Sequence, residues 1–205
     1  MSDRHTIASI DDLRTLYAAP GERALRKQLA KLDVHCLRFI ELSPFVVLSS
    51  CGADGLPDAS PRGGDPGFVE ALGDSRLLIP DAPGNNRLDT LQNIVETGRI
   101  GLLFLIPGVD ETLRVNGRAR LSARDDWLDR MTTERRRPKL VIEVEGLEAY
   151  LHCAKALMRS KLWHGDSRIE RSALPTMGQM LRDQTNSEVP AESQQAMLER
   201  YAADL

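Results

Sequence analysis

The sequence of 205 residues has little cysteine, and the cysteines it has form no recognisable pattern. Cys36, Cys51 and Cys153 cannot all pair within the chain, and none of them belongs to a CxxC motif. A disulfide framework and a zinc ribbon are therefore disfavoured, and a reducing cytoplasm is the expected location.

Long hydrophobic segments are also missing. The longest strongly apolar run, Ile100 to Ile106, is interrupted by Gly101, whereas a membrane-spanning helix needs about 20 apolar residues. Residues 1–16 mix acidic and basic side chains and lack the apolar core of a signal peptide. We therefore expect a cytoplasmic protein that does not interact with membranes.

A strong excess of positive charge is absent too. Lys and Arg number 27 against 30 for Asp and Glu, which gives a net charge of -3. General affinity for nucleic acid or for an anionic membrane needs a broad basic surface, so no nucleic acid partner is expected. Any anionic ligand must be bound by a local cluster of Arg or Lys.

The common catalytic and nucleotide-binding signatures do not occur. The sequence has no GxSxG, no GxxxxGK[ST], no HExxH and no GxGxxG after a predicted strand. Its four histidines, His5, His35, His152 and His164, include no pair at metal-ligand spacing. We therefore expect no metal site.

What the sequence does contain is the pattern of an antiparallel sheet. From Thr112 to Ser122, the odd positions are apolar or small and the even positions are polar or charged. A period of two with one polar face is typical of an antiparallel strand. Further strands are expected at 45–51, 56–60, 76–80, 100–106 and 140–144, so the centre should be a barrel or curled sheet of five to seven strands.

Helices are expected at both ends of this sheet. Ser9 can cap a helix that has Asp11 and Asp12 in its first turn, and Gly98 should end another. The expected helical segments are 9–42, 87–97, 125–131, 146–163, 176–183 and 191–202. The fold class is therefore α+β in a single domain, with a helical N-terminal part (1–43), a barrel core (44–145) and C-terminal helices (146–205).

Two turns have the composition of an anion-binding site. Ser60-Pro61-Arg62-Gly63-Gly64 places an arginine after a strand, where glycines leave the backbone amides accessible. Pro83-Gly84-Asn85-Asn86-Arg87 precedes a predicted helix, whose free amides and dipole favour a phosphate. Either turn alone is common, but the two together on consecutive elements indicate phosphate binding.

A third feature is a row of side chains on the predicted helix 146–163. His152, Lys155, Arg159 and Trp163 follow at spacings of three, four and four, which aligns them on one side of a helix. Such a row could face an anionic, aromatic ligand or could be a solvated face. Three other arginines are expected to face solvent or a partner chain, namely Arg114, Arg118 and Arg120. The arginine run at 135–137 is expected to be an exposed loop.

In combination, these segments resemble the pyridoxamine 5'-phosphate oxidase-like FMN-binding split barrels, closest to a bacterial branch of FMN-dependent enzymes. The likeness covers roughly residues 40 to 165. The segments that carry it are Ser-Pro-Arg-Gly at 60–63, Pro-Asp-Ala-Pro-Gly-Asn-Asn-Arg at 80–87, Ile-Gly-Leu-Leu-Phe-Leu-Ile-Pro-Gly at 100–108, Glu-Thr-Leu-Arg-Val-Asn-Gly at 111–117, His-Cys-Ala-Lys-Ala at 152–156 and Arg-Ser-Lys-Leu-Trp at 159–163.

The resemblance implies a six-stranded antiparallel split barrel and a homodimer with one FMN in each of two clefts at the subunit interface. It implies that the FMN phosphate is held by Ser60, Arg62, Gly63, Asn86 and Arg87. The backbone at Ile79 and Pro80 would border the flavin ring, Glu111 and Thr112 would approach it from the other subunit, and Lys155, Arg159 and Trp163 would close the cleft.

One departure limits the functional inference. The Arg-x-His substrate motif of true pyridoxamine phosphate oxidases is absent, because Trp163 is followed by His164, Gly165 and Asp166. The expected function is therefore FMN-dependent hydride transfer to or from a small molecule, with a reduced nicotinamide, NAD(P)H, as one candidate donor. No residue is an evident general base, so only binding roles are assigned, with substrate contacts at His152, Lys155 and Arg159.

Two alternatives stay open at this point. The chain could be a non-catalytic flavin-binding or redox-sensing protein. It could also use the same barrel to bind haem or a deazaflavin, and haem would need an axial histidine, for which only His152 and His164 are placed.

Overall fold

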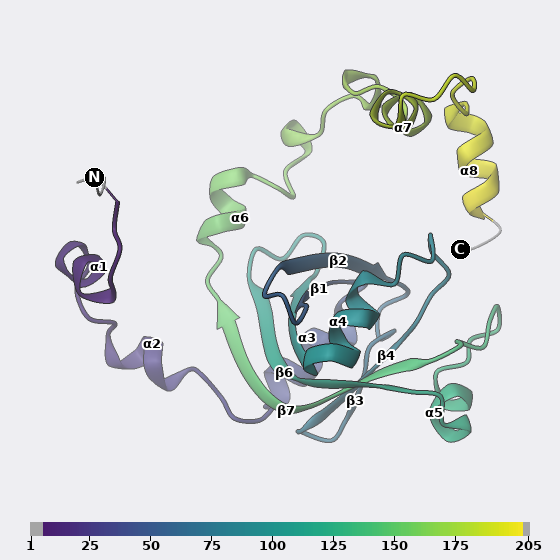
Figure 1. The fold of residues 1–205 in the computed structure, drawn as a ribbon. Coiled ribbons are helices and arrows are strands. Elements are labelled where there is room, and N and C mark those ends of the chain that lie inside the picture. The colour runs from purple at the N-terminus through teal and green to yellow at the C-terminus, as the bar shows by residue number, and fades with distance from the viewer. Residues whose placement is uncertain (1–5, 203–205) are drawn as a thin grey trace.

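The computed structural model describes residues 6–202 and contains one antiparallel sheet flanked by helices (Figure 1). The strand order is β2-β1-β5-β6-β7-β4-β3, so β2 and β3 are the edges of a sheet that does not close. The strands are β1 Phe45–Cys51, β2 Pro57–Gly63, β3 Glu70–Leu72, β4 Arg76–Pro80, β5 Arg99–Leu105, β6 Thr112–Ser122 and β7 Val141–His152. The α+β class with an antiparallel sheet is therefore confirmed.

The helices lie before, between and after the strands. They are α1 Ile10–Leu16, α2 Glu22–Arg26, α3 Val34–Leu42, α4 Asp89–Thr97, α5 Asp125–Arg130, α6 Lys155–Ser160, α7 Met177–Thr185 and α8 Gln194–Ala202. Ser9 caps α1 as predicted, since its hydroxyl oxygen accepts a hydrogen bond from the backbone N–H of Asp12 at 3.0 Å. Gly98 ends α4 in the left-handed conformation, also as predicted.

The core lies on the concave side of the curved sheet. The alternation along β6 is confirmed, because Leu113 and Val115 are fully buried. Helix α4 packs against β1, β2, β5 and β6 and contributes Leu91 and Ile94 to the same core. A smaller apolar cluster lies where α5 covers Leu78 and its neighbours on the other face of the sheet. Removing these side chains from water stabilises the fold by roughly 25 cal/mol per Å² of apolar surface.

Strand β7 is longer than the sequence predicts, and the predicted helix 146–163 is wrong over its first part. Strand β7 runs to His152, and its second half pairs with the start of β6 from Thr112↔His152 to Asn116↔Glu148. Ala149 exchanges two backbone hydrogen bonds with Leu29, at 2.9 and 2.8 Å. This pairing with distant segments outweighs the local helical spacing of apolar residues.

The β6–β7 ladder is interrupted at one point. Its register shifts between Asn116 and Arg118, and on the opposite strand Gly146 has a φ of +63°. Glycine tolerates this left-handed conformation, which is typical of a β-bulge. The bulge divides the ladder into two ends, one running from Thr112 to Asn116 and the other from Arg118 to Ser122.

Two further differences concern short elements. Strand β3 is not predicted from the sequence, because it has only three residues and is defined by its pairing with β4. With β3 the sheet has seven strands, which is within the five to seven expected from the pattern and one more than the resemblance implies. The edge strand β2 contains Pro57 and Pro61, and proline within a sheet is confined to edges and strand ends.

Both chain ends extend away from the sheet. Helices α1 and α2 contain no buried residue. Helices α6 to α8 follow one another from the end of β7 and form an arm that leads away from the sheet (Figure 1). The predicted helices near 176–183 and 191–202 are present as α7 and α8, and Thr176 with Gln179 forms a capping box at the start of α7. Within residues 6–202, no helix has the length and apolar character needed to cross a membrane.

Candidate functional site

The inner face of the edge strand β2 presents a short row of polar side chains. Asp58, Ser60 and Arg62 alternate with exposed residues and are each partly buried. They pair in register with Ser50, Leu48 and Val46 of β1, whose side chains are buried on the core side. The period of two in a strand therefore turns this row toward the interior of the curved sheet.

Arg62 links the two ends of the open sheet. Its Nη1 donates a hydrogen bond of 2.8 Å to Oδ1 of Asp81, just after β4, and the two side chains are only 18% and 17% exposed. Strands β2 and β4 are far apart in the sheet order, so the ion pair joins segments that no backbone ladder connects. The Nε of Arg62 is buried and has no hydrogen-bond partner among residues 6–202, which is unusual for a buried donor.

The segment after Asp81 turns sharply into α4. Asn86 and Leu88 both have left-handed backbones, with φ of +59° and +62°, and the Asn85 side chain accepts a hydrogen bond from the N–H of Arg87 at 3.1 Å. Asparagine adopts this conformation readily, whereas leucine does so at a cost. The turn leaves the amides of the first turn of α4 without a side-chain cap.

A second contact fixes this turn against β2. The Thr90 hydroxyl, at the start of α4, donates a hydrogen bond of 2.8 Å to Oδ2 of Asp58. Together with the Arg62–Asp81 pair, it holds residues 81–90 beside β2. The structure thus brings Ser60, Arg62 and Gly63 to the same corner of the sheet as Asn86 and Arg87.

Arg87 is the exposed cation of this corner. Its Nε donates to Oδ2 of Asp89 at 2.8 Å, and 73% of its side chain is exposed. The hydrogen bond to Asp89 and, to a lesser degree, the charge of Asp58 raise the pKa of Arg87. The other donors of this corner, which are the Nε of Arg62, the outer nitrogens of Arg87 and the amides that open α4, are of the kinds that bind phosphate in proteins.

The two residues expected beside the flavin ring lie at the end of β4. Ile79 is fully buried in the core, so only its backbone could border a ligand. Strand β3 pairs with Arg76 to Leu78 and stops there, so the backbone of Ile79 and Pro80 extends beyond the end of β3. This position is consistent with the expected role.

Glu111, Thr112 and Trp163 form a separate group. The first two lie at the start of β6, and Nε1 of Trp163 donates a hydrogen bond of 2.9 Å to the carbonyl of Val109 in the preceding loop. Within the described part of the chain, no hydrogen bond or ion pair joins this group to Arg62 or Arg87. In the sheet order, β1 and β5 lie between β2, which carries Arg62, and β6, at whose start this group lies.

The row predicted along helix 146–163 does not form. His152 is the last residue of β7, and only Lys155 and Arg159 belong to the six-residue helix α6. The Nε of Arg159 donates to the carbonyl of Lys155 at 3.0 Å. Spacing of three and four aligns side chains only in a continuous helix, and here the first member is in a strand.

His152 instead belongs to a cluster that the sequence did not reveal, made by Lys27, Arg114, Tyr150 and His152. The imidazole meets the Tyr150 ring edge-on, with the ring centres 5.0 Å apart. Lys27 Nζ lies 4.1 Å and Arg114 Cζ 5.1 Å from the centre of the same ring. Burial lowers the pKa of His152, and the positive charges of Arg114 and Lys27 lower it further.

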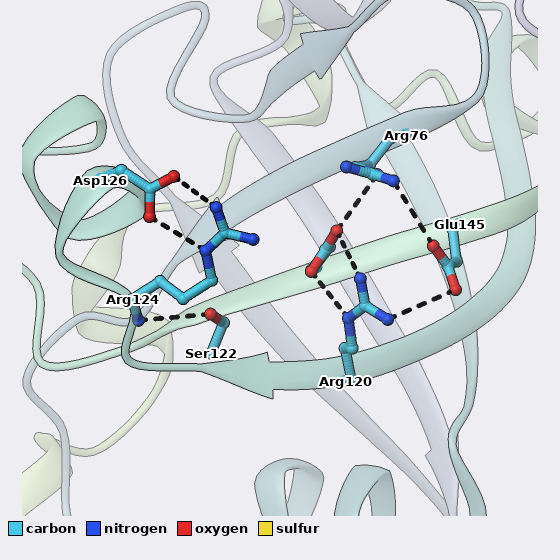
Figure 2. Close-up of polar contacts among 7 residues, drawn as sticks. Arg76, Arg120, Ser122, Arg124, Asp126 and Glu145 are labelled. Carbon is cyan, nitrogen blue, oxygen red and sulfur yellow. Dashed lines mark hydrogen bonds and ion pairs between the residues drawn. The ribbon is translucent and has the colours of Figure 1, made fainter.

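A second charged cluster lies at the other end of the ladder (Figure 2). Glu143 in β7 is 2% exposed and accepts hydrogen bonds from Nε and Nη2 of Arg120 at 2.8 and 3.0 Å, while Arg76 Nε lies 3.1 Å away. Glu145 lies 3.8 Å from Arg76 and 3.7 Å from Arg120. The hydrogen bond from Arg120 lowers the pKa of Glu143. Arg120 is 58% exposed, as the sequence predicts, but it also pairs with Glu143 within the chain.

Comparison with known families identifies the fold's relatives. The model of the family described as "Pyridoxamine 5'-phosphate oxidase" matches residues 32–153, which span the sheet from α3 to the end of β7. The chain belongs to the pyridoxamine 5'-phosphate oxidase family. Membership in this family agrees with the open antiparallel sheet and with the resemblance found in the sequence. No curated protein matches the chain.

Solved structures also match this family member. HupZ from Group A Streptococcus is 15% identical over 56% of this chain and 88% of that one, with a TM-score of 0.47. An FMN-binding protein from Syntrophomonas wolfei is 18% identical over 57% and 81%, with a TM-score of 0.42. An F420 reductase is 17% identical over 53% and 90%, with a TM-score of 0.39.

Proposed function

We propose that this family member is an FMN-dependent oxidoreductase that transfers hydride to or from a small molecule, with reduced nicotinamide, NAD(P)H, as one candidate donor. The observation that carries the proposal is the corner formed by β2 and residues 81–90. There, a buried Arg62 Nε without a partner, an exposed Arg87 and the open first turn of α4 offer donors to one phosphate. FMN has such a phosphate, and its ring supplies the redox chemistry when bound.

Each part of the chain has a distinct role in this proposal. Arg62 and Arg87 hold the phosphate, with Ser60, Gly63 and Asn86 beside them. Asp81 keeps the Arg62 guanidinium in place through the 2.8 Å ion pair. The backbone at Ile79 and Pro80 borders the ring. These are binding and orienting roles, and no residue is assigned as a general base.

The active form is proposed to be a homodimer. Glu111, Thr112 and Trp163 would then complete the cleft of the other subunit, with Lys155 and Arg159 closing it, because they lie apart from the phosphate corner of their own chain. The helices that extend from the sheet support this, since they expose apolar residues that a second copy can cover, among them Ile10, Leu13, Leu16, Met158 and Leu162. The unpaired cysteines support a cytoplasmic location.

The test begins with the absorption spectrum and FMN titration of the purified protein. Arg87→Ala should weaken FMN binding at least tenfold, because a hydrogen bond to a charged group contributes roughly 1.5–3 kcal/mol. Arg118→Ala, on the outer part of β6, is the matched control and should bind FMN normally. Unchanged affinity in Arg87→Ala contradicts the phosphate assignment.

Further readings separate the alternatives. Turnover with NADPH and an electron acceptor indicates an oxidoreductase, whereas tight FMN binding without turnover indicates a flavin carrier or redox sensor. A Soret band after haem titration, or binding of a deazaflavin in place of FMN, changes the cofactor but keeps the barrel. Light scattering with and without FMN determines the oligomeric state.

A further inference from the structure

We propose that Lys27, Arg114, Tyr150 and His152 form a binding site for an oxyanion, either the carboxylate or the phosphate of the small-molecule substrate. The inference rests on the proposed function in one respect, since it takes the ligand to be that enzyme's substrate. The site itself is distinct from the phosphate corner at Arg62 and Arg87.

The strands place these residues together on one face of the sheet. In the β6–β7 ladder, Arg114 is opposite Tyr150 and Thr112 is opposite His152. All four point to the same face because they occupy alternate positions on paired strands. Thr112 is one of the residues proposed to approach the flavin ring, so the cluster adjoins the part of the sheet assigned to the cleft.

Lys27 reaches the cluster from the N-terminal segment. The backbone pairing of Leu29 with Ala149 brings this segment alongside the free edge of β7. The Lys27 ammonium donates a hydrogen bond of 2.8 Å to the carbonyl of Leu151 and lies over the Tyr150 ring. One of its three N–H groups is used in this hydrogen bond, so others are available to a ligand.

The charges of the cluster are not balanced within the chain. Glu148 is the carboxylate that Arg114 contacts, with Nη2 and Oε1 3.2 Å apart, and Asn116 also donates to it at 3.4 Å. Within residues 6–202, no carboxylate forms an ion pair with Lys27. Two cations therefore lie over the ring of one tyrosine, accompanied by one carboxylate, which leaves a site of positive potential.

Unused donors in the cluster also indicate a ligand. The Nε of Arg114 is buried and has no hydrogen-bond partner in the described part of the chain, and a buried donor without an acceptor is unfavourable. An oxyanion between Arg114 and Lys27 would accept from both. It would also face the His152 ring, which lies near Arg114 from β6, Lys27 from the N-terminal segment and Tyr150 from its own strand. Glu148, four residues earlier on β7, contacts Arg114.

The experiment follows the His152 ring by NMR in the full-length protein, at constant ionic strength set with chloride. Inorganic phosphate and sodium benzoate are the two probes, and His152→Gln assigns the signal. Binding of either anion should raise the His152 pKa, because a negative charge favours the imidazolium. The probe that binds more tightly identifies the substrate's group as phosphate or carboxylate.

Two variants and a control locate the effect. Arg114→Gln should weaken anion binding about tenfold, and Lys27→Met should do the same. Arg114→Lys keeps the charge but loses Nε, and should weaken binding less than Arg114→Gln. Arg118→Gln removes a charge from the same strand outside the cluster, and should leave binding unchanged.

Two results would overturn the proposal. One is a His152 pKa that neither anion changes. In that case the cluster only holds the N-terminal segment against β7. The other is an equal loss of binding in Arg118→Gln, which would indicate general screening. The measurement needs no flavin, so the two proposals are tested separately. A negative anion titration does not contradict FMN binding at Arg87, and a failure to bind FMN does not contradict the oxyanion site.

Discussion

The β6–β7 ladder has arginines at both ends, but the bulge at Asn116–Arg118 separates two different arrangements of charge. At one end, Arg76 and Arg120 share two carboxylates, Glu143 and Glu145, and every charge has a partner (Figure 2). At the other end, Lys27 and Arg114 share one carboxylate, and the Nε of Arg114 has no acceptor.

The difference separates two uses of the same residue type. A fully paired network in a sheet stabilises the arrangement of its strands, because each buried polar group is satisfied. A cluster with surplus cations gains from an added anion, and so is suited to binding. Variants at the two ends should therefore have opposite profiles, one affecting stability and the other affecting ligand affinity.

The largest effect is expected from Glu143→Gln. The change leaves two arginines facing a neutral amide, and breaking a buried ion pair costs 3–5 kcal/mol in general. Since Arg76 and Arg120 are 39% and 58% exposed, we expect a loss of about 2 kcal/mol in the free energy of unfolding, measured by urea denaturation. Glu148→Gln, at the other end, should lose less than about 0.5 kcal/mol. Equal losses of unfolding free energy in Glu143→Gln and Glu148→Gln would contradict the difference between the two ends of the ladder.

The same carboxylate should make stability sensitive to acid. The pKa of Glu143 is lowered in the folded protein, first by its hydrogen bond from Arg120, from an ordinary value of 4.5. The stability it contributes is therefore present above pH 4.5 and is lost as the pH falls through its folded value. The gap in unfolding free energy between wild type and Glu143→Gln should narrow as urea titrations move from pH 7 toward pH 3. A gap that stays constant would refute this assignment.

A pair of arginine variants sharpens the comparison further. Arg120→Gln should lower the free energy of unfolding by less than Glu143→Gln does, because it leaves Glu143 with one cation, Arg76. Arg114→Gln should change stability by less than about 0.5 kcal/mol while weakening anion binding. Thermal melts measure the stability of each variant, and the phosphate titration measures its anion affinity. A larger loss of stability in Arg114→Gln than in Arg120→Gln would contradict the comparison.

The smallest expected effect concerns Cys153, next to His152. A hydrogen bond from the backbone N–H of Lys155 lowers the pKa of this exposed thiol, and the charges of Lys155 and Lys27 lower it further. Burial raises the pKa of Cys36 to about 11. Iodoacetamide should thus modify Cys153 well before Cys36, and Lys27→Met should slow the reaction slightly. Mass spectrometry of the alkylated peptides checks both, and faster labelling of Cys36 would contradict them.

How far the sequence predicts this protein depends on whether a feature is local. Alternation along 112–122 and the turn at Gly98 are properties of neighbouring residues, and both predictions are confirmed. The second half of β7 was mistaken for a helix, because its strand character comes from pairing with β6 and Leu29.

For the candidate site too, the sequence predicts the local features and misses those that depend on distant segments. Arg62 and Arg87 could be proposed from their turns, and the structure places their segments side by side. The roles of Asp81 and Lys27 could not be predicted, because each acts on a residue distant in sequence. Asp81 belongs to the segment 80–87 that carries the resemblance, but its pairing with Arg62 comes from the fold. The predicted row from His152 to Trp163 is wrong, because regular spacing aligns side chains only within one helix. The fold has a strand up to His152 and a helix only from Lys155 to Ser160.

The two prolines of β2 have a consequence for how copies of the chain can assemble. Each lacks the N–H that an added strand would need, so Pro57 and Pro61 oppose extension of the sheet at this edge by a neighbouring molecule. Continuous sheets across subunits, and the fibrous aggregates that grow from them, are disfavoured on this side. Association is thereby directed to the faces of the sheet and to the helices that extend from it.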